Sequence, residues 1–287
     1  MVATSTSNKL RLALRAAFLA LAIVAAFGSV LGQQRQDISL PFVDGEQLVY
    51  TAEFNRALLR GVDVGELRFS AKISPPAAAT DKPVVTLVGD AVTKGFLIRL
   101  AGSKFHIHVE SVADAKPFVV LQTKGLYEDK RTTINSQAVF DHAAGKAVWT
   151  AHEQNHEANA TTLSFAEPVQ DVLTLIYFVR TQDLSPGRPV EVAMIDNGHV
   201  YRCVVEVLAG KKMSTALGRV NTVRLEPAIF DGNREVRRRG TLSIWLTDDA
   251  RHIPVKAQVK ASIGTIDIKL KSISYRDRNM ALQSGKR

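Results

Sequence analysis

The chain has 287 residues, a formal net charge of +9 and a single cysteine, Cys203. One cysteine excludes an internal disulfide framework, and no GxSxG, P-loop or dinucleotide-binding pattern occurs in the sequence. The positive charge fits a modestly basic soluble surface, although it could also attract nucleic acid or an anionic envelope surface.

Residues 1–32 have the pattern of a secretory signal. Lys9, Arg11 and Arg15 supply a positive region, residues 16–27 form an unbroken apolar run, and small residues follow. This order is typical of an export signal, and the run is shorter than the roughly 20 residues of a membrane span. We therefore expect a periplasmic or secreted protein that does not bind nucleic acid, with an uncleaved N-terminal membrane anchor as the alternative.

The rest of the chain is expected to form one β-rich domain at residues 33–275, followed by a polar tail at 276–287. All-β sandwiches and barrels of about 200–250 residues often form a single domain. No apolar stretch after the signal is long enough to cross a bilayer, so we do not expect this domain to span a membrane.

Alternating apolar and polar residues run through this domain and predict β-strands. In GELRFSAKI, for example, Leu67, Phe69 and Ala71 fall on one face and the charged residues fall on the other. Turn-forming residues separate such segments at intervals of about 10–14 residues, as in an antiparallel meander. The predicted strands are residues 46–54, 65–73, 104–112, 188–195, 199–208, 218–227, 239–247, 253–263 and 264–275. We expect a mainly β fold with a curved antiparallel sheet or an incomplete β-barrel.

One or two short helices are expected beside the sheet. Residues 170–181 are apolar almost all round. A helix of that kind must be buried, so we place it against the concave side of the sheet or in the mouth of a barrel. Asp171 lies at its N-terminus, where an acidic side chain interacts favourably with the helix dipole. Residues 93–102 form the second candidate helix.

Cys203 is expected to be a core residue. It lies in the alternating segment VYRCVVEV, on the same face as Tyr201, Val205 and Val207. Nothing basic lies beside it on that face to lower the pKa of the thiol, so a reactive role is disfavoured.

The segment HEQNHE contains His152, Glu153 and His156 in the spelling of the zinc-protease motif HExxH. That chemistry requires a helix, because a helix brings both imidazoles to one ion with the glutamate poised as a base. The segment lacks an apolar stripe, and Asn159 and Thr162 occupy positions where the extended zincin pattern continues. We therefore expect strand and turn here, with His152 and His156 on one face, and a zinc hydrolase is the less favoured alternative.

His106 and His108 lie two residues apart in a predicted strand and share a face. Such a pair can bind a metal ion when a neighbouring strand supplies a third ligand. We interpret the pair as part of a solvated strand face, and we predict no metal site and no cofactor.

Four arginines, Arg234, Arg237, Arg238 and Arg239, form a basic cluster and are the candidate ligand-binding residues. Bidentate contacts from their guanidinium groups could hold a phosphate or an anionic head group. The alternative, which we favour, is a charged hairpin that discourages edge-to-edge pairing of strands.

Asp248, Asp249 and Arg251 place two carboxylates beside a cation. An enzyme could be built on such a set, but its position between two predicted strands favours a hairpin turn. We predict no catalytic residues.

Three stretches carry a recognisable pattern: DGEQLVY at 44–50, VQDVLTLIYFVRTQDLSPG at 169–187, and GTLSIWLTDDARHIPVKAQVKASIGTIDIKL at 240–270. Together they resemble domain-of-unknown-function family 3108, a group of exported bacterial proteins, and the likeness covers most of residues 40–275. The matching positions are Gly45, Glu46, Tyr50, Gln170, Asp171, Tyr177, Arg180, Gly187, Trp245, Leu246, Asp249, Pro254 and Gly264. The resemblance implies an export signal and a β-rich fold, and it assigns no catalytic role to these positions.

We therefore expect an exported envelope protein without enzymatic activity. By fold-level analogy with the half-open barrels of lipoprotein carriers, its concave face would hold an apolar or amphipathic envelope ligand such as a lipid. The alternatives are an assembly factor that binds an envelope protein through residues 233–240, and a zinc hydrolase at His152, Glu153 and His156.

Overall fold

The computed structural model describes residues 40–56, 59–75, 82–95, 104–232, 234–237, 240–262 and 264–275. The predicted signal at 1–32, most of the predicted helix at 93–102 and the tail at 276–287 lie outside these residues. Within the described ranges, no helix has both the length and the apolar character needed to cross a membrane.

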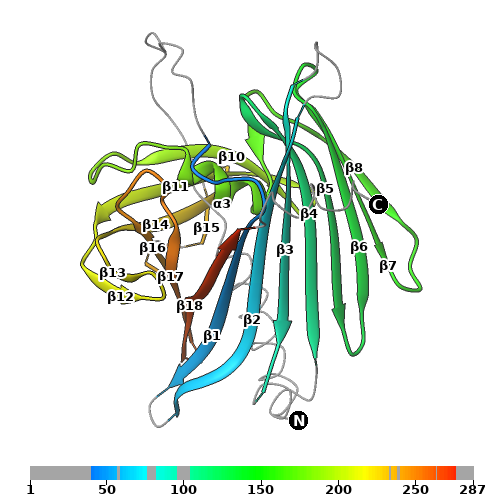
Figure 1. Cartoon of the computed structure of the whole chain (residues 1–287). Helices are drawn as coiled ribbons and strands as arrows, with labels where there is room; N and C mark the ends of the chain where they lie inside the picture. Colours follow the sequence, from blue (N-terminus) through cyan, green and yellow to red (C-terminus); the bar gives the residue numbers. More distant parts are fainter. Residues whose placement is uncertain are drawn as a thin grey trace, which may run out of the picture.

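In the described part of the chain, sixteen strands form one large sheet and two short strands form a separate hairpin (Figure 1). The strands are β1 (Glu46–Arg56), β2 (Leu59–Ser74), β3 (Val84–Thr93), β4 (Phe105–Ala115), β5 (Phe118–Asp129), β6 (Thr133–Asp141), β7 (Lys146–Glu153), β8 (Asn159–Ser164), β9 (Val169–Gln170), β10 (Val190–Asp196), β11 (His199–Ala209), β12 (Met213–Thr215), β13 (Gly218–Val220), β14 (Thr222–Asp231), β15 (Arg234–Arg237), β16 (Leu242–Thr247), β17 (Pro254–Ala261) and β18 (Gly264–Tyr275). The small hairpin consists of β12 and β13.

The first strand pairs with the last, so both lie in the middle of the large sheet. On one side of this pair the strands continue in sequence order from β2 to β8. On the other side they run through β17, β16, β14, β11 and β10 to β9, and the β9–β10 pair is parallel. Because β8 and β9 are the two ends of this order, the sheet stays open and does not close into a barrel. The predicted curved sheet or incomplete barrel is confirmed.

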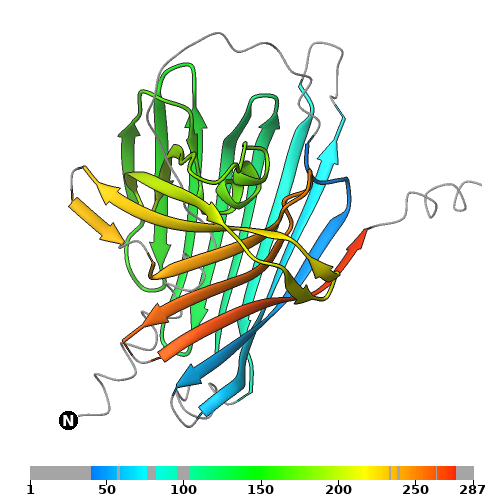
Figure 2. The same cartoon turned by 90° about the vertical axis from the view of Figure 1, so that its left-hand side faces the viewer.

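The sheet folds back on itself as two walls. Strands β1–β8 form a long wall, and the strands from β18 to β10 cross its inner face at an angle (Figure 2). The helix α3 (Val172–Arg180) lies between the two walls and contacts β3, β4, β5 and β10. The predicted buried helix at 170–181 is therefore confirmed within two residues at each end.

Strand alternation explains how the long wall buries one face. On β3, Val85, Leu87 and Ala91 are buried, whereas Thr86, Val88 and Asp90 on the other face are half-exposed. Gly89 continues the buried row, and a Cβ there would lie 3.3 Å from the side chains of Leu173 and Phe69. The missing side chain thus allows α3 to approach the sheet closely.

The start of α3 is fixed by Asp171, which is its N-cap. Asp171 Oδ1 accepts a hydrogen bond from the Thr174 backbone N–H at 2.6 Å, and Thr174 Oγ1 accepts one from the Asp171 N–H at 3.0 Å. This reciprocal capping box satisfies two backbone donors that the helix leaves unpaired. Oδ2 also accepts from the hydroxyls of Ser111, at 2.5 Å, and Thr123. The helix is therefore anchored to β4 and β5.

The core lies mainly between the walls. Cys203 is fully buried there on β11, with Val205 and Val207 on the same face, which confirms its predicted place in the core. A second cluster, around Phe140 and Ile195, packs β10 against the inner face of β5, β6 and β7.

Candidate functional site

The outer face of the long wall is the face turned away from α3. Ser111 on β4 points inward, because its hydroxyl bonds to Asp171 at the start of the helix. Successive strand residues point to opposite faces, so His108 and Glu110 point outward.

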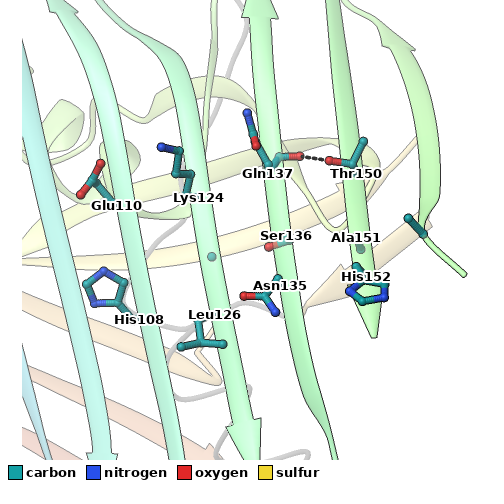
Figure 3. Close-up of a pocket in the computed structure, with 12 residues that line it drawn as sticks. His108, Glu110, Lys124, Leu126, Asn135, Ser136, Gln137, Thr150, Ala151 and His152 are labelled. Atoms are coloured by element: carbon teal, nitrogen blue, oxygen red, sulfur yellow. Dashed lines mark hydrogen bonds between the residues drawn. The ribbon is translucent and has the colours of Figure 1, made fainter. Parts of the chain in front are cut away.

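A depression of about 490 Å³ lies on this outer face across β4, β5, β6 and β7, and we call it the outer depression (Figure 3). Most of its side chains lie in two rows that follow the pairing of the four strands. The first row consists of His108, Leu126, Asn135 and His152, and the second consists of Glu110, Lys124, Gln137 and Thr150. The antiparallel register therefore assembles the depression from residues that are distant in sequence.

Seven of the eight side chains in these two rows carry polar groups. Glu110 and Lys124 lie directly opposite each other, so opposite charges meet on neighbouring strands. Thr150 Oγ1 donates a hydrogen bond to the Gln137 carbonyl at 3.4 Å. The amide, hydroxyl and imidazole groups can donate and accept hydrogen bonds with a polar molecule, the Lys124 ammonium group can donate them, and Leu126 adds an apolar contact.

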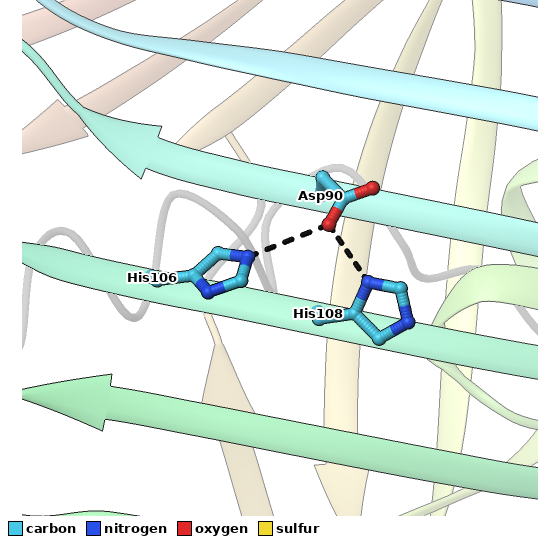
Figure 4. A group of neighbouring side chains, drawn as sticks. All are labelled: Asp90, His106 and His108. Atoms are coloured by element: carbon cyan, nitrogen blue, oxygen red, sulfur yellow. Dashed lines mark hydrogen bonds and ion pairs between the residues drawn. The ribbon is translucent and has the colours of Figure 1, made fainter.

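Three side chains of types that can bind a metal ion, Asp90, His106 and His108, meet beside the outer depression (Figure 4). Asp90 Oδ1 lies 2.7 Å from His108 Nδ1 and 3.4 Å from His106 Nε2. The other ring nitrogen of His106 lies 3.3 Å from Glu128 Oε2. The sequence identified the histidine pair but not its neighbours, because only the register of β3, β4 and β5 brings Asp90 and Glu128 to it.

The HEQNHE segment is a strand end followed by a turn, as predicted, and it is not a helix. His152 lies on β7, and Glu153 is the last residue of that strand. His156 lies in the turn, where its backbone N–H donates to the Glu153 carbonyl at 3.0 Å and its Nδ1 lies 3.2 Å from the Gln154 carbonyl. The expectation that His152 and His156 share a strand face is wrong, because the strand ends between them.

The predicted basic cluster is only partly described. Arg234 is exposed and pairs with Asp231, with Nη2 3.1 Å from Oδ2. The backbone of Arg237 pairs with β14, whereas Arg238 and Arg239 lie outside the described residues. The described part is a charged hairpin, and ligand binding by the four arginines stays a prediction.

Asp248, Asp249 and Arg251 lie in the turn between β16 and β17, as predicted. Asp249 Oδ1 accepts from the Thr247 hydroxyl at 2.8 Å and from the Arg251 backbone N–H at 3.0 Å. Its other oxygen lies 3.2 Å from Arg251 Nη2. The Asp249 carboxylate therefore holds the turn together.

Several positions that carry the family resemblance meet in the interior. The side chain of Arg180 is fully buried, and its guanidinium donates to both carboxylate oxygens of Glu46. Burial disfavours the charge of Arg180, but the hydrogen bond to Glu46 and the negative charge of that carboxylate, with smaller contributions from Tyr177 and Tyr50, together outweigh burial and raise the pKa of Arg180. The Tyr50 hydroxyl donates to the Pro254 carbonyl at 2.8 Å. These contacts join β1, α3 and β17, so these residues stabilise the fold.

A pocket of about 90 Å³ on the inner face contains two carboxylates, Asp171 and Asp196, beside Trp149. Burial raises the pKa of Asp196 to about 6, against the opposing hydrogen bond from Asn197, and the nearby Asp171 carboxylate raises it further. The volume leaves room for about three water molecules. Asp196 is the last residue of β10, and nothing in the sequence around it shows that Asp171 lies nearby.

An apolar pocket on the inner face has a volume of only about 30 Å³. Its lining includes Ala52, Val64, Leu67, Ala91, Phe105, Ile266 and Ile268. That volume is close to the space of one water molecule in the liquid. This pocket by itself could not hold an acyl chain.

Comparisons with known proteins bear on the family and the fold. A family model described as a protein of unknown function, DUF3108, matches residues 49–271. No curated protein matches the chain.

Two solved structures are similar to the chain. The β-barrel-like protein of the domain of unknown function DUF1849 from Brucella abortus is 11% identical, with a TM-score of 0.52, and the match covers 82% of this chain and 100% of that one. A candidate exported protein with a YmcC-like fold from Bacteroides fragilis is 8% identical, with a TM-score of 0.33, and the match covers 82% of this chain and 98% of that one. The first likeness concerns the fold alone.

Proposed function

Because the chain belongs to the DUF3108 family of proteins of unknown function, we propose a function from its geometry: it is an exported, non-enzymatic protein that binds a polar, hydroxyl-rich ligand in the outer depression. The observation that carries the proposal is the convergence of two cross-strand rows of mostly polar side chains on one open volume. That volume, about 490 Å³, lies within the range of about 300–1,000 Å³ that is typical of small-molecule sites.

The chemistry of the lining favours a saccharide. Sugar hydroxyls both donate and accept hydrogen bonds, and Asn135, Gln137 and Thr150 offer matching donors and acceptors. Lys124 adds a charge-assisted bond to a hydroxyl or an acidic sugar, and Leu126 offers an apolar surface to the C–H face of a sugar ring. An exported protein, as the N-terminal pattern predicts, meets such glycans in the cell envelope.

Titration of purified glycan fragments tests the proposal. The probes are soluble peptidoglycan fragments and the core oligosaccharide of lipopolysaccharide, added to the purified protein in a calorimeter. The double variant Asn135→Ala, Gln137→Ala removes two exposed amides and should weaken binding at least tenfold, because each lost hydrogen bond costs about 1 kcal/mol. Val139→Ala changes an exposed residue one row further along the same face of β6 and should leave binding unchanged. No binding of either probe, or equal binding by the double variant, contradicts the proposal.

A carrier for an apolar or amphipathic ligand is the second candidate function. The observation in its favour is the almost wholly apolar lining of the inner pocket, around Ala91 and Phe105. Its volume of about 30 Å³ ranks this candidate below the first. Mass spectrometry of organic extracts from the purified protein distinguishes the carrier function from glycan binding. A stoichiometric lipid favours the carrier, whereas lipid-free protein that binds glycans favours the outer depression.

A further inference from the structure

We propose that Asp90, His106 and His108 form a binding site for a divalent transition-metal ion on the outer face of β3 and β4. The ligand atoms of the three side chains all lie within 4.8 Å of one another. Two imidazole nitrogens with one carboxylate oxygen suit zinc and its first-row neighbours better than calcium or magnesium. The inference concerns the ion alone and does not depend on the proposed glycan binding.

The three ligand atoms are near enough to surround one ion after small side-chain rotations. In a tetrahedral site, zinc lies about 2.0–2.1 Å from each nitrogen or oxygen, which sets neighbouring ligand atoms about 3.4 Å apart. Asp90 Oδ1 lies 2.7 Å from His108 Nδ1 and 3.4 Å from His106 Nε2. The three side chains are 37–38% exposed, so they have room for the small rotations that would admit an ion.

The sheet itself brings the three ligands together. Asp90 is directly opposite His108 in the antiparallel pairing of β3 with β4. His106 is two residues from His108 and therefore lies on the same face. The two imidazole planes are inclined by 55°, with ring centres 6.4 Å apart. Figure 4 shows both rings directed at the same carboxylate oxygen.

Glu128 is a positioning residue for His106. It lies opposite His106 on β5, and its Oε2 is 3.3 Å from His106 Nδ1, while His106 Nε2 is directed at Asp90. Metal-bound histidines almost always donate their second ring N–H to a carboxylate, a carbonyl or water, which fixes the tautomer and the ring orientation. The negative charges of Asp90 and Glu128 would balance the two positive charges of the ion.

The proposed metal site borders the outer depression. His108 belongs both to the ligand set and to the first row of the outer depression. Three protein ligands leave at least one coordination position of a zinc ion unoccupied by protein. An ion held by His108 therefore lies at the edge of the outer depression.

Titration of zinc chloride into the metal-free purified protein tests the site. We expect one zinc ion per chain, with an affinity at least tenfold lower in each of the variants Asp90→Asn, His106→Ala and His108→Ala, because each loses one of three ligands. His156→Ala and His199→Ala are matched controls, since both histidines are exposed and lie outside the ligand set. These two variants should bind zinc like the unaltered protein.

Cobalt provides a second readout that depends on the ligands themselves. Cobalt(II) bound by fewer than six ligands absorbs visible light more strongly than the hydrated ion, and His108→Ala should abolish this absorption. Glu128→Gln should weaken zinc binding about tenfold and keep the absorption, because it changes the orientation of His106 and not the ligand set. An unchanged zinc affinity in Glu128→Gln would overturn the positioning role.

Two outcomes would overturn the site as a whole: no zinc binding by the unaltered protein, or unaltered affinity in all three ligand variants. Circular dichroism of each variant checks that it is folded. These experiments can contradict the metal site without contradicting the proposed function, and the reverse. Zinc binding without glycan binding removes the proposed function, and glycan binding without zinc binding removes the metal site.

Discussion

Arg180 and Glu46 lie 134 residues apart in the sequence and form a two-point ion pair in the interior. Arg180 Nη1 donates to Oε1 at 2.6 Å, and Nη2 donates to Oε2 at 3.1 Å. The guanidinium carbon also lies 5.4 Å from the ring centre of Phe42 and 5.3 Å from that of Tyr177. Nε donates to the Arg251 carbonyl at 3.1 Å. One side chain thus ties α3 to β1 and to the turn between β16 and β17.

Removal of one partner of this pair should destabilise the fold strongly. Glu46→Gln leaves a buried guanidinium without its counter-charge, and Arg180→Met leaves a buried carboxylate, and such changes cost about 3–5 kcal/mol. Urea unfolding followed by circular dichroism measures the effect. Arg188 forms an exposed pair with Asp183, so Arg188→Ala should cost at most about 1 kcal/mol. Similar losses for the buried and exposed pairs would contradict this prediction.

Asp171 joins the start of α3 to two strands through one carboxylate. It accepts hydrogen bonds from the Thr174 N–H and from the hydroxyls of Ser111 and Thr123. Asp171→Ala should cost about 2–4 kcal/mol, because a lost N-cap costs about 1 kcal/mol and a buried hydroxyl without an acceptor costs about 1–3 kcal/mol. Asp171→Ser keeps a capping oxygen and should cost less. Thermal unfolding ranks the two variants, and the opposite order would be inconsistent with the capping role.

Strands with regular alternation could be predicted from the sequence. The segments 46–54, 199–208 and 264–275 match β1, β11 and β18 within two residues. The strand β3 was missed, because its inner row includes Gly89, which has no side chain where α3 approaches. The strand β8 was missed because it is an edge strand in which five of six residues are exposed, so it has no buried face to create an apolar pattern.

The candidate site could be predicted only in part. The spacing within one strand put His106 and His108 on one face, but Asp90 and Glu128 join them through pairing with β3 and β5. His152 likewise lines the outer depression because β7 pairs with β6, and the HExxH spelling plays no part in this. Strand register depends on turn geometry and on the partner strand, which a single segment of sequence does not contain.

Gly264 should not tolerate a side chain. It has a φ of 147°, and a Cβ would lie 2.7 Å from both the Asn55 carbonyl oxygen and the Phe54 ring. Gly264→Ala should therefore cost about 3 kcal/mol or more, because backbone strain and steric overlap add. Gly232 also has a positive φ, of 57°, but a Cβ there has no neighbour within 4 Å, so Gly232→Ala should cost only about 1 kcal/mol. Chemical denaturation of both variants measures how much of the lost stability comes from steric overlap of the new Cβ. Equal losses of stability in the two variants would show that steric overlap at Gly264 has no effect.

The raised pKa of Asp196 makes the stability of the protein depend on pH. Burial brings this pKa to about 6 in the folded state, compared with about 3.9 for an unfolded aspartate. The folded state therefore holds the proton more tightly than the unfolded state. Through this group, stability should fall as the pH rises from about 4 to about 6 and then stay constant, because the folded protein must then bear a partly buried carboxylate charge.

Asp196→Asn should remove this loss of stability. At about pH 7.5 the variant should be more stable than the unaltered protein by up to about 3 kcal/mol, because one pKa unit corresponds to about 1.4 kcal/mol, and the two should converge near pH 4. Asp183 is the matched control, because hydrogen bonds from Ser185 lower its pKa and Asp183→Asn should slightly reduce stability at the higher pH. Thermal unfolding at both pH values measures the three proteins. An advantage of Asp196→Asn that is the same at both pH values would show that ionisation of the Asp196 carboxyl is not its source.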